Sequence, residues 1–593
     1  MPKFSKNVML AALLSTSSFA EAAPTAYYGL TVVDPVSETR TPDSYIVVDR
    51  GQIVLMGRGK PPSTIPAADR RDLRGRYALP GFFDTHAHVS IGPLRGRTVD
   101  GARVIDSSGN DSITRHAALM LLAHGITSIR DPGGDASRLV AYRDGVAAGD
   151  LVGPEARIAG EIIHRSPFPV AGLIAPISQT AEIPALVRRQ AEAGVDFVKL
   201  YEGLTLEDLA AGIAEARRAR VGTIAHLSDV SWTRAAELGI DALVHSIPIS
   251  PDLLPANRRA AYVASRRPGS YAFFEWYEQA DLDAPEIREM IRTLARRGVR
   301  FDATMIAFQL AFWGDDRTVR DRDLWAAHPA FAENWRTKFR FDLGWQPSDY
   351  ARAKAVWSKV LRLVRMLHEA GVPMTIGTDM NNPFVAPGAS FAREMQLHTQ
   401  AGIPNWAVLR MATSEAARAL DMDRRTGRLR PGMEADIVFL AADPSVDLAA
   451  AATPVGVLAN GRFYDPAALR TQAAAVAEQA PAADCGDGCT PDSTIIALYE
   501  AVSAAPGVGW DRPRLHALFH PDARLVTAAP ASGGTRSSSA TIANLIDSME
   551  RHYRATGFVE REYLRDFRST SARHRPDVGR QMAGLGNGDG RHE

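Results

Sequence analysis

The stretch Pro80-Gly81-Phe82-Phe83-Asp84-Thr85-His86-Ala87-His88 decides the fold of this 593-residue chain. In an extended strand, residues two positions apart point to the same face, so His86 and His88 can direct their imidazoles at one point. Neutral imidazole is a common ligand for Zn²⁺ and similar ions. The pair therefore predicts a metal site, although a hydrogen-bonded structural pair of histidines would have the same spacing.

Further polar residues lie within or directly after other short apolar runs. His226 ends Thr223-Ile224-Ala225-His226, His245 ends Ala242-Leu243-Val244-His245, and Asp379 ends Met374-Thr375-Ile376-Gly377-Thr378-Asp379. The carboxyl ends of strands form the active face of a parallel α/β barrel. Each residue alone is more typical of a satisfied polar group at a strand end. In serial order, they predict a metal centre.

Lys199 lies inside the apolar run Phe197-Val198-Lys199-Leu200 of a chain with only seven lysines. A buried charged amine is costly unless it is paired or neutral. A neutral amine can react with CO₂ to give a carbamate, whose oxygens can bridge two metals. The alternatives are an amine that reaches solvent from the end of a strand, or a structural ion pair.

The middle of the chain alternates between expected strands and expected helices. This pattern over roughly 350 residues favours an α/β fold with a parallel barrel. Short β-type runs in the flanks, at 26–77 and 427–461, predict two segments that pair into one small sandwich. The expected strands are 77–79, 127–129, 197–200, 222–225, 242–244, 301–305 and 374–376, and the expected helices include 113–123, 183–193, 206–219 and 351–370.

With its order His-x-His, Lys, His, His, Asp, the chain resembles the amidohydrolase superfamily from about Tyr45 to Asp465, most of all the imidazolonepropionase-related and prolidase-related branch. The resemblance implies a distorted TIM (β/α)8 barrel with a β-sandwich built from both flanks. It implies that His86, His88 and Asp379 hold one metal. It also implies that the Lys199 carbamate bridges to a second metal held by His226 and His245. Two Zn²⁺ ions are expected, and a single divalent metal is the alternative.

The same resemblance implies hydrolysis of an amide or peptide-like C–N bond in a small-molecule substrate. A metal-bound hydroxide would attack, and Asp379 would act as the general base that passes the proton to the leaving nitrogen. Alternatives are a lactone, an ester or a ring deamination substrate, or an inactive metal-bearing binding protein. Tyr201 and His164 are the candidate substrate contacts.

Several other residues have two interpretations. Arg130 and Asp131 could form an ion pair under the pocket floor. Three aromatic residues could line the pocket or belong to a packed insertion, namely Phe308, Phe312 and Trp313.

The first residues predict export to the periplasm or the medium. Lys3 and Lys6 precede the apolar run Val8 to Leu14, and Ala20-Glu21-Ala22 has the pattern of a cleavage site, so 1–23 is expected to be a signal peptide. No later run is long and apolar enough to predict a membrane span. The 68 basic and 68 acidic residues balance, which argues against a nucleic-acid partner. A homo-oligomer stays open.

The remaining boundaries follow from composition. The first sandwich segment is expected at 24–78, the barrel at 79–424 and the second sandwich segment at 425–466. An Ala/Pro/Gly-rich linker is expected at 467–493, containing Cys485 and Cys489, which could form a disulfide or stay free. Residues 494–567 resemble the opening of the ketosteroid-isomerase-like fold and predict a partial α+β unit, followed by a disordered tail at 568–593.

Overall fold

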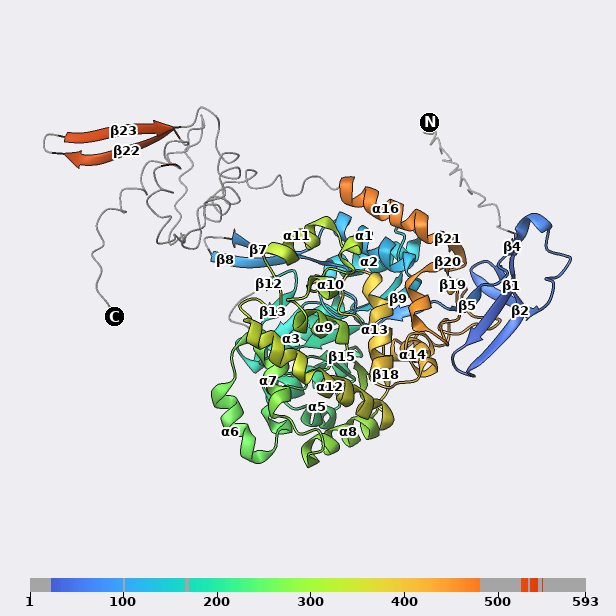
Figure 1. Ribbon diagram of the computed structural model, residues 1–593, viewed down its shortest axis with the longest axis horizontal. Helices are drawn as coiled ribbons and strands as arrows, with labels where there is room; N and C mark the ends of the chain where they lie inside the picture. Colours follow the sequence, from blue (N-terminus) through green and yellow to red (C-terminus); the bar gives the residue numbers. More distant parts are fainter. Residues whose placement is uncertain are drawn as a thin grey trace, which may run out of the picture. The chain divides into compact units, whose positions relative to one another are not determined.

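The computed structural model describes residues 23–99, 102–165, 170–479, 524–531, 534–541 and Asp547 (Figure 1). The expected signal peptide before Ala23, both cysteines, the tail and most of 494–567 lie outside the described residues. Contacts divide the chain into two compact units, one of Met1–Arg95 with Ile105–Gln479 and one of Gly96–Val104 with Ala480–Glu593. The first unit contains every candidate site residue.

The two flanks of the chain join in one eight-stranded sheet. The joint is antiparallel pairing between β5 (Tyr77–Pro80) and β19 (Ile437–Leu440), with Ile437 opposite Pro80. Residues 77–79 therefore belong to this sheet, and not to the barrel as their apolar run suggested. The other strands are β1 (Thr25–Asp34), β2 (Thr39–Asp49), β3 (Gln52–Arg58), β4 (Arg70–Asp72), β20 (Pro454–Ala459) and β21 (Arg462–Tyr464).

Eight parallel strands follow one another in a closed circuit. They are β6 (Phe82–Asp84), β9 (Ile126–Asp131), β10 (Glu155–Ile158), β14 (Phe197–Leu200), β15 (Gly222–Ala225), β16 (Ala242–Val244), β17 (Arg300–Asp302) and β18 (Met374–Thr375). Continuous pairing is interrupted twice, where single bridges join Ala159 to Phe197 and Ala87 to Met380. The parallel α/β barrel expected from the sequence is therefore present in a distorted form. Beside β14, the strands β11 (Ile162–His164) and β13 (Ile174–Pro176) extend the sheet.

Helices connect the barrel strands and pack their apolar faces on them. In α4, Thr205 and Asp208 form a capping box at the N-terminus, while Leu209 and Ile213 are buried. The connecting helices are α1 (Asp111–Ala123), α2 (Ala136–Ala148), α3 (Ile183–Glu192), α4 (Leu206–Ala219), α5 (Trp232–Leu238), α8 (Pro285–Arg297) and α12 (Pro347–Glu369). After β18 come α13 (Ala389–Gln400), α14 (Asn405–Met411) and α15 (Ser414–Ala419).

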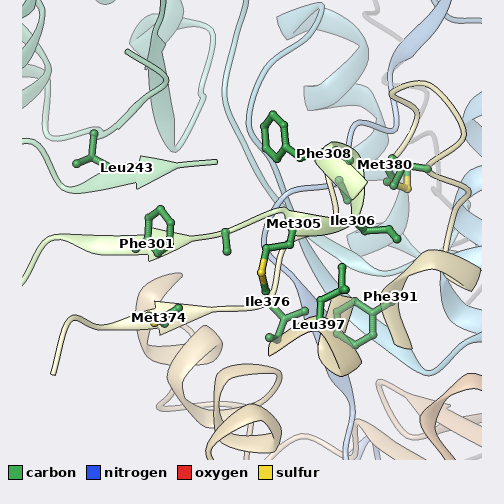
Figure 2. Packing of buried hydrophobic residues seen from close by; sticks show 14 of the residues in the cluster. Leu243, Phe301, Met305, Ile306, Phe308, Met374, Ile376, Met380, Phe391 and Leu397 are labelled. Carbon is green, nitrogen blue, oxygen red and sulfur yellow. The ribbon is translucent and has the colours of Figure 1, made fainter. Parts of the chain in front are cut away.

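The hydrophobic core continues across neighbouring barrel strands. Figure 2 shows Leu243, Phe301 and Met374 on three adjacent strands, and each is at most 1% exposed. The expected strand 301–305 is shorter than predicted because Thr304 takes a left-handed conformation with φ 44°. The chain then enters α9 (Met305–Phe312).

Two helical insertions carry the aromatic residues of the segment around residues 256–345. The first consists of α6 (Ala256–Ser265) and α7 (Ala272–Gln279), before α8. The second consists of α9, α10 (Arg317–Arg320) and α11 (Pro329–Thr337), before α12. Trp276 and Trp335 are at most 1% exposed, so much of this aromatic content is core.

The expected linker is wrong at its start, because α16 covers Pro466–Gln479. Leu469 and Ala473 are buried, and Ser112 donates a hydrogen bond to the carbonyl of Val476. The same alanine content that suggested a linker also has a high helix propensity, and packing against α1 decides between the two.

Three smaller features complete the described structure. The strands β7 (Ile91–Val99), β8 (Ala102–Ser108) and β12 (Val170–Ala171) form a three-stranded sheet. β22 (Arg524–Ala531) pairs antiparallel with β23 (Gly534–Thr541). Among the described helices, none combines the length and apolarity that a bilayer crossing requires.

Candidate metal centre

The structure brings the six predicted ligand residues to the carboxyl ends of the barrel strands. Lys199 lies within β14, and the others follow a strand: His86 and His88 follow β6, His226 follows β15, His245 follows β16, and Asp379 follows β18. All six are at most 6% exposed. The prediction that His86 and His88 lie within a strand is wrong, because β6 ends at Asp84.

Asp379 lies at the centre of this group. Its Oδ1 is 3.3 Å from Nε2 of His86 and 3.3 Å from Nε2 of His88. Ligand-type atoms of His86, His245 and Asp379 all lie within 4.8 Å of one another. Two ligands on one tetrahedral Zn²⁺ lie roughly 3.4 Å apart, given bonds of about 2.1 Å. The spacing of these donors therefore fits a divalent metal.

Hydrogen bonds from the far side orient three of the imidazoles. Nδ1 of His86 lies 2.9 Å from Oδ1 of Asp302, and Nδ1 of His88 lies 2.9 Å from the carbonyl of Gly133. Nδ1 of His245 lies 2.7 Å from Oγ1 of Thr304. With Nδ1 engaged, each ring keeps Nε2 free for a ligand bond, as is usual for metal-binding histidines.

Nδ1 of His226 has no hydrogen-bond partner within the described structure. Its Nε2 lies 3.1 Å from Oε1 of Glu202 as an ion-pair contact, and its ring centre is 4.4 Å from that of His245. A buried imidazole nitrogen without a hydrogen-bond partner is rare, because its desolvation is then uncompensated. The unpartnered Nδ1 supports a second ligand position beside His245.

Burial keeps the imidazoles of His86 and His245 in their neutral forms. It lowers the pKa of His86 and of His245 well below the ordinary value, and lowers the pKa of the Lys199 amine to about 7. His88 differs, because the carboxylates of Asp131 and Asp379 outweigh burial and raise its pKa to about 9. A metal must therefore displace a proton from His88.

The carboxylate of Asp379 stays ionised in spite of its burial. Burial opposes its ionisation, but the facing imidazoles of His86 and His88 and the Lys199 amine lower its pKa overall. Nδ2 of Asn382 donates a hydrogen bond of 2.7 Å to Oδ1 of Asp379. The site therefore contains an ionised carboxylate beside the neutral imidazoles of His86 and His245, which is a suitable donor set for Zn²⁺.

The backbone is strained at three of these positions. His245 has φ 70°, Asp379 has φ 65° and Thr304 has φ 44°, in the left-handed region that side chains disfavour. The amides of His245 and Asp379 donate to the carbonyls of Asp302 and His86, at 2.9 and 2.8 Å. Such strain occurs mainly where the surrounding structure imposes it, and it is typical of functional sites.

The charged residues beneath the site differ from the expected pairing. Arg130 pairs with Asp302 and not with Asp131. Asp131 instead accepts a hydrogen bond of 2.8 Å from the amide of Val89. Asp302 is buried between Arg130 and His86, so it connects the cation below the site with the first histidine.

A cavity of about 100 Å³ adjoins the candidate ligands. Tyr201 lines it, whereas His164 does not line it and instead packs on Tyr201, with ring centres 5.3 Å apart. Phe308 lines the cavity, but Phe312 and Trp313 pack against Trp357. The remaining wall comes from Ile91, Ile162, Leu173, Phe273, Phe341 and Asn382.

Sequence reasoning did not assign the partners that orient the ligands. Asp302 ends β17 as Asp379 follows β18, so its position at the end of a strand was a usable signal. Thr304, Gly133 and Glu202 carry no such signal, because their contacts depend on how separate loops meet.

The fold and the site define the class of this protein. The profile described as the amidohydrolase family matches residues 77–464, more than half of the chain, so the chain belongs to this family. It is accordingly a hydrolase with a candidate divalent-metal site.

Solved structures of low identity share the fold. A putative prolidase from Bifidobacterium longum is 23% identical with a TM-score of 0.53, and the match covers 76% of this chain and 99% of that one. A Xaa-Pro dipeptidase with bound methionine in the active site is 19% identical with a TM-score of 0.54, covering 75% and 100%. Bottromycin amidohydrolase is 23% identical with a TM-score of 0.56, covering 76% and 90%.

No curated protein matches the chain. The expected ketosteroid-isomerase-like unit at 494–567 receives no support, since the matched family covers residues 77–464.

Proposed function

We propose that this protein hydrolyses an amide or peptide-like C–N bond of a small substrate in a metal-dependent reaction. The observation that carries the proposal is the buried carboxylate of Asp379, which faces the imidazoles of His86, His88 and His245 beside a cavity. Membership of the amidohydrolase family supports the same chemistry.

Two groups of residues would hold the metal. His86, His88 and Asp379 would hold the first ion, and Lys199 as a carbamate would connect it to a second ion held by His226 and His245. Nitrogen and oxygen donors of this kind make Zn²⁺ the proposed ion, with a single metal as the alternative. When bound, such a metal polarises a carbonyl and lowers the pKa of bound water toward about 7.

Carbamate formation joins the Lys199 nitrogen to the carbon of CO₂ and releases one proton. It requires an unprotonated amine, and burial lowers the pKa of Lys199 to about 7. The amine is therefore available for this reaction at neutral pH.

Asp379 is the proposed general base. Because Asn382 donates to its Oδ1, Oδ2 is the oxygen left to accept a proton from the attacking water. The same oxygen would then deliver the proton to the leaving nitrogen, which converts a poor leaving group into a neutral amine.

The first substrates to test are Xaa-Pro dipeptides, because two similar structures carry prolidase or Xaa-Pro dipeptidase in their names. N-acyl amino acids, other dipeptides and lactones complete the panel. Turnover of lactones alone would move the reaction to C–O bonds on the same site. Metal binding without turnover of any compound would support the inactive binding protein.

The decisive variant is Asp379→Asn. We expect the metal content to be largely retained and kcat to fall by about 10²–10⁴-fold, the usual contribution of a general base. Asp423→Asn, at an exposed position, is the matched control and should keep full activity. Full turnover by the Asp379 variant would exclude its role as the base.

The two-metal arrangement has a separate test. We expect the metal content to fall from two ions to one in Lys199→Ala, and a ¹³C carbamate resonance from labelled bicarbonate to be lost. Lys359→Ala removes a lysine that donates to the carbonyls of Tyr277 and Ala280, away from the site, and should change neither result. Equal metal content in all three proteins would contradict the bridging lysine.

We also propose that the protein is exported. The support is the basic start, the apolar run Val8 to Leu14 and the pattern Ala20-Glu21-Ala22. Protein recovered from the periplasm or the medium should begin at Ala23 or Pro24 on N-terminal sequencing. An N-terminus at Met1 in the cytoplasm would contradict export.

A further inference from the structure

A second cavity, of about 430 Å³, lies at the opposite end of the barrel from the metal centre. Arg300 and Met374, the first residues of β17 and β18, line it. At the other ends of the same strands, Asp302 is the last residue of β17 and Asp379 follows β18. Figure 2 shows Met374 and Met380 at opposite ends of this part of the chain. The cavity is therefore separate from the proposed active site.

The floor of this cavity is apolar. Val372 and Met374 come from the end of the α12–β18 connection and the start of β18, and Ala407 and Met411 come from α14. Each of the four is at most 4% exposed. Small-molecule sites commonly combine such an apolar wall with a few polar groups and a volume of roughly 300–1,000 Å³.

The rim of the cavity is cationic. Arg300, Arg410 and Arg418 line it with a single carboxylate, Glu415, among the described residues. Burial lowers the pKa of His368, which also lines the cavity, so this ring adds no charge at neutral pH.

Two of the three guanidinium groups are available for a ligand. Arg410 is engaged, with Nη1 2.5 Å from Oε1 of Glu38 and Nε 3.6 Å from Oε1 of Glu415. Across residues 23–99, 102–165 and 170–479, no carboxylate lies within ion-pair distance of Arg300 or Arg418. Arg300 is half-buried beside the apolar floor, and Arg418 is exposed and interacts with Glu415 beyond ion-pair distance. Two guanidinium groups beside an apolar floor are a suitable site for an anion.

We propose that this cavity binds a small amphipathic organic anion. Its apolar part would lie on Met374 and Met411, and its carboxylate or phosphate head would be held by Arg300 and Arg418. Planar guanidinium groups can bind both head groups through two parallel hydrogen bonds. The proposal does not depend on the reaction at the metal centre.

The proposed anion binding is tested by isothermal titration calorimetry of the metal-loaded full chain. The ligands are hexanoate, hexyl phosphate and the neutral hexanamide. We expect saturable binding of at least one of the two anions and none of the neutral amide. Arg300→Gln and Arg418→Gln should each weaken binding by about tenfold or more, the usual effect of losing a charged hydrogen bond. The relative affinities of hexanoate and hexyl phosphate show whether the cavity prefers a carboxylate or a phosphate head group.

Controls separate this cavity from the metal centre. Arg424→Gln, at an exposed position outside the cavity, should bind the anions as the unchanged protein does. Both cavity variants should keep full hydrolytic activity while losing anion affinity; if the anions bound at the metal instead, both variants would bind them as the unchanged protein does. Arg418 is exposed, so its variant tests the proposal even if Arg300→Gln fails to fold. Absence of saturable anion binding, or equal affinity in Arg300→Gln, Arg418→Gln and the unchanged protein, would overturn the proposal.

Discussion

Asp302 is the residue that connects the candidate metal centre with the interior of the barrel. It accepts from the buried guanidinium of Arg130 and lies 2.9 Å from Nδ1 of His86. One carboxylate therefore compensates a buried cation and holds an imidazole in orientation. Removing it should affect both stability and metal binding.

Asp302→Ala tests this double role. We expect the metal affinity to fall by about 10–100-fold, as for other partners of metal-binding histidines. We also expect the free energy of unfolding to fall by about 3–5 kcal/mol, because Arg130 is left buried without its carboxylate. Competition with a chromophoric chelator and calorimetry measure the two effects. Asp302→Asn, which keeps the shape, should lose less stability, and unchanged metal affinity in Asp302→Ala would argue against His86 as a ligand.

Among the elements, the contact of the barrel with the eight-stranded sheet depends on a close approach at Gly125. This glycine joins α1 to β9 with φ 79°, and a Cβ there would lie 2.6 Å from Cγ2 of Val438 in β19. Gly149 at the end of α2 has φ 80° and nothing within 4 Å of an added Cβ. Substitutions at the two glycines therefore separate the free-energy cost of the left-handed backbone conformation from the cost of the clash with Val438.

Gly125→Ala should destabilise the protein more than Gly149→Ala does. Both variants carry the left-handed penalty of about 1 kcal/mol, and only the first adds an overpacking cost of about 1–3 kcal/mol. Urea denaturation of the two variants measures the difference. Equal losses of unfolding free energy in the two variants would mean that β19 moves to accommodate the added Cβ at no free-energy cost.

The start of α9 depends on the carboxyl group of a residue in another helix. Glu394 in α13 accepts hydrogen bonds from the amides of Met305 and Ile306, at 3.0 and 2.6 Å. Burial raises the pKa of Glu394 to about 8, although these amides oppose the shift. Because the folded state holds this proton more tightly than the unfolded state, its contribution to stability is lost as the pH rises from 4.5 to about 8.

Glu394→Gln removes this titration. The variant should start from a lower melting temperature, since its amide satisfies the two N–H groups less well. Between about pH 5 and about pH 8, however, its melting temperature should fall less steeply than that of the unchanged protein. Scans at several pH values check this, with exposed Glu237→Gln as the control. Parallel profiles would show that Glu394 does not titrate in this range.

At the scale of the whole molecule, the candidate ligands come from strands far apart along the chain. His86 follows β6 and Asp379 follows β18. Nε2 of His86 lies 3.3 Å from Oδ1 of Asp379, at the place where the last barrel strand meets the first. A metal that binds only this folded arrangement stabilises it by mass action, by about 4 kcal/mol at a thousandfold excess over Kd. Metal binding and barrel closure are therefore expected to be coupled.

Removing the metal with a chelator should lower the melting temperature, and adding Zn²⁺ back should restore it. His245→Ala should show a much smaller shift on chelation, because it removes one of three residues whose ligand atoms lie within 4.8 Å of one another. Differential scanning calorimetry with and without chelator provides the measurement. No shift in the unchanged protein would contradict a bound structural or catalytic metal.

The local sequence pattern was sufficient to predict most of the helices and strands of the barrel. The expected ranges 197–200, 222–225 and 242–244 coincide with β14, β15 and β16, and 206–219 coincides with α4. Here the apolar runs and the capping residues agree with the packing. Prediction was wrong where tertiary contacts decided, as for residues 77–79, which pair with β19, and for the start of the linker, which became α16.

The sequence by itself determined the order of the strands and helices and the ligand-type residues at the strand ends, because both follow from periodicities of a few residues. Only the tertiary structure decided that Asp302 orients His86, that Thr304 orients His245, and that Phe273 and Phe341 close the cavity. Asp302 and His86 are 216 positions apart. No local pattern encodes such a contact, because its free energy depends on desolvation and geometry that exist only once the barrel has closed.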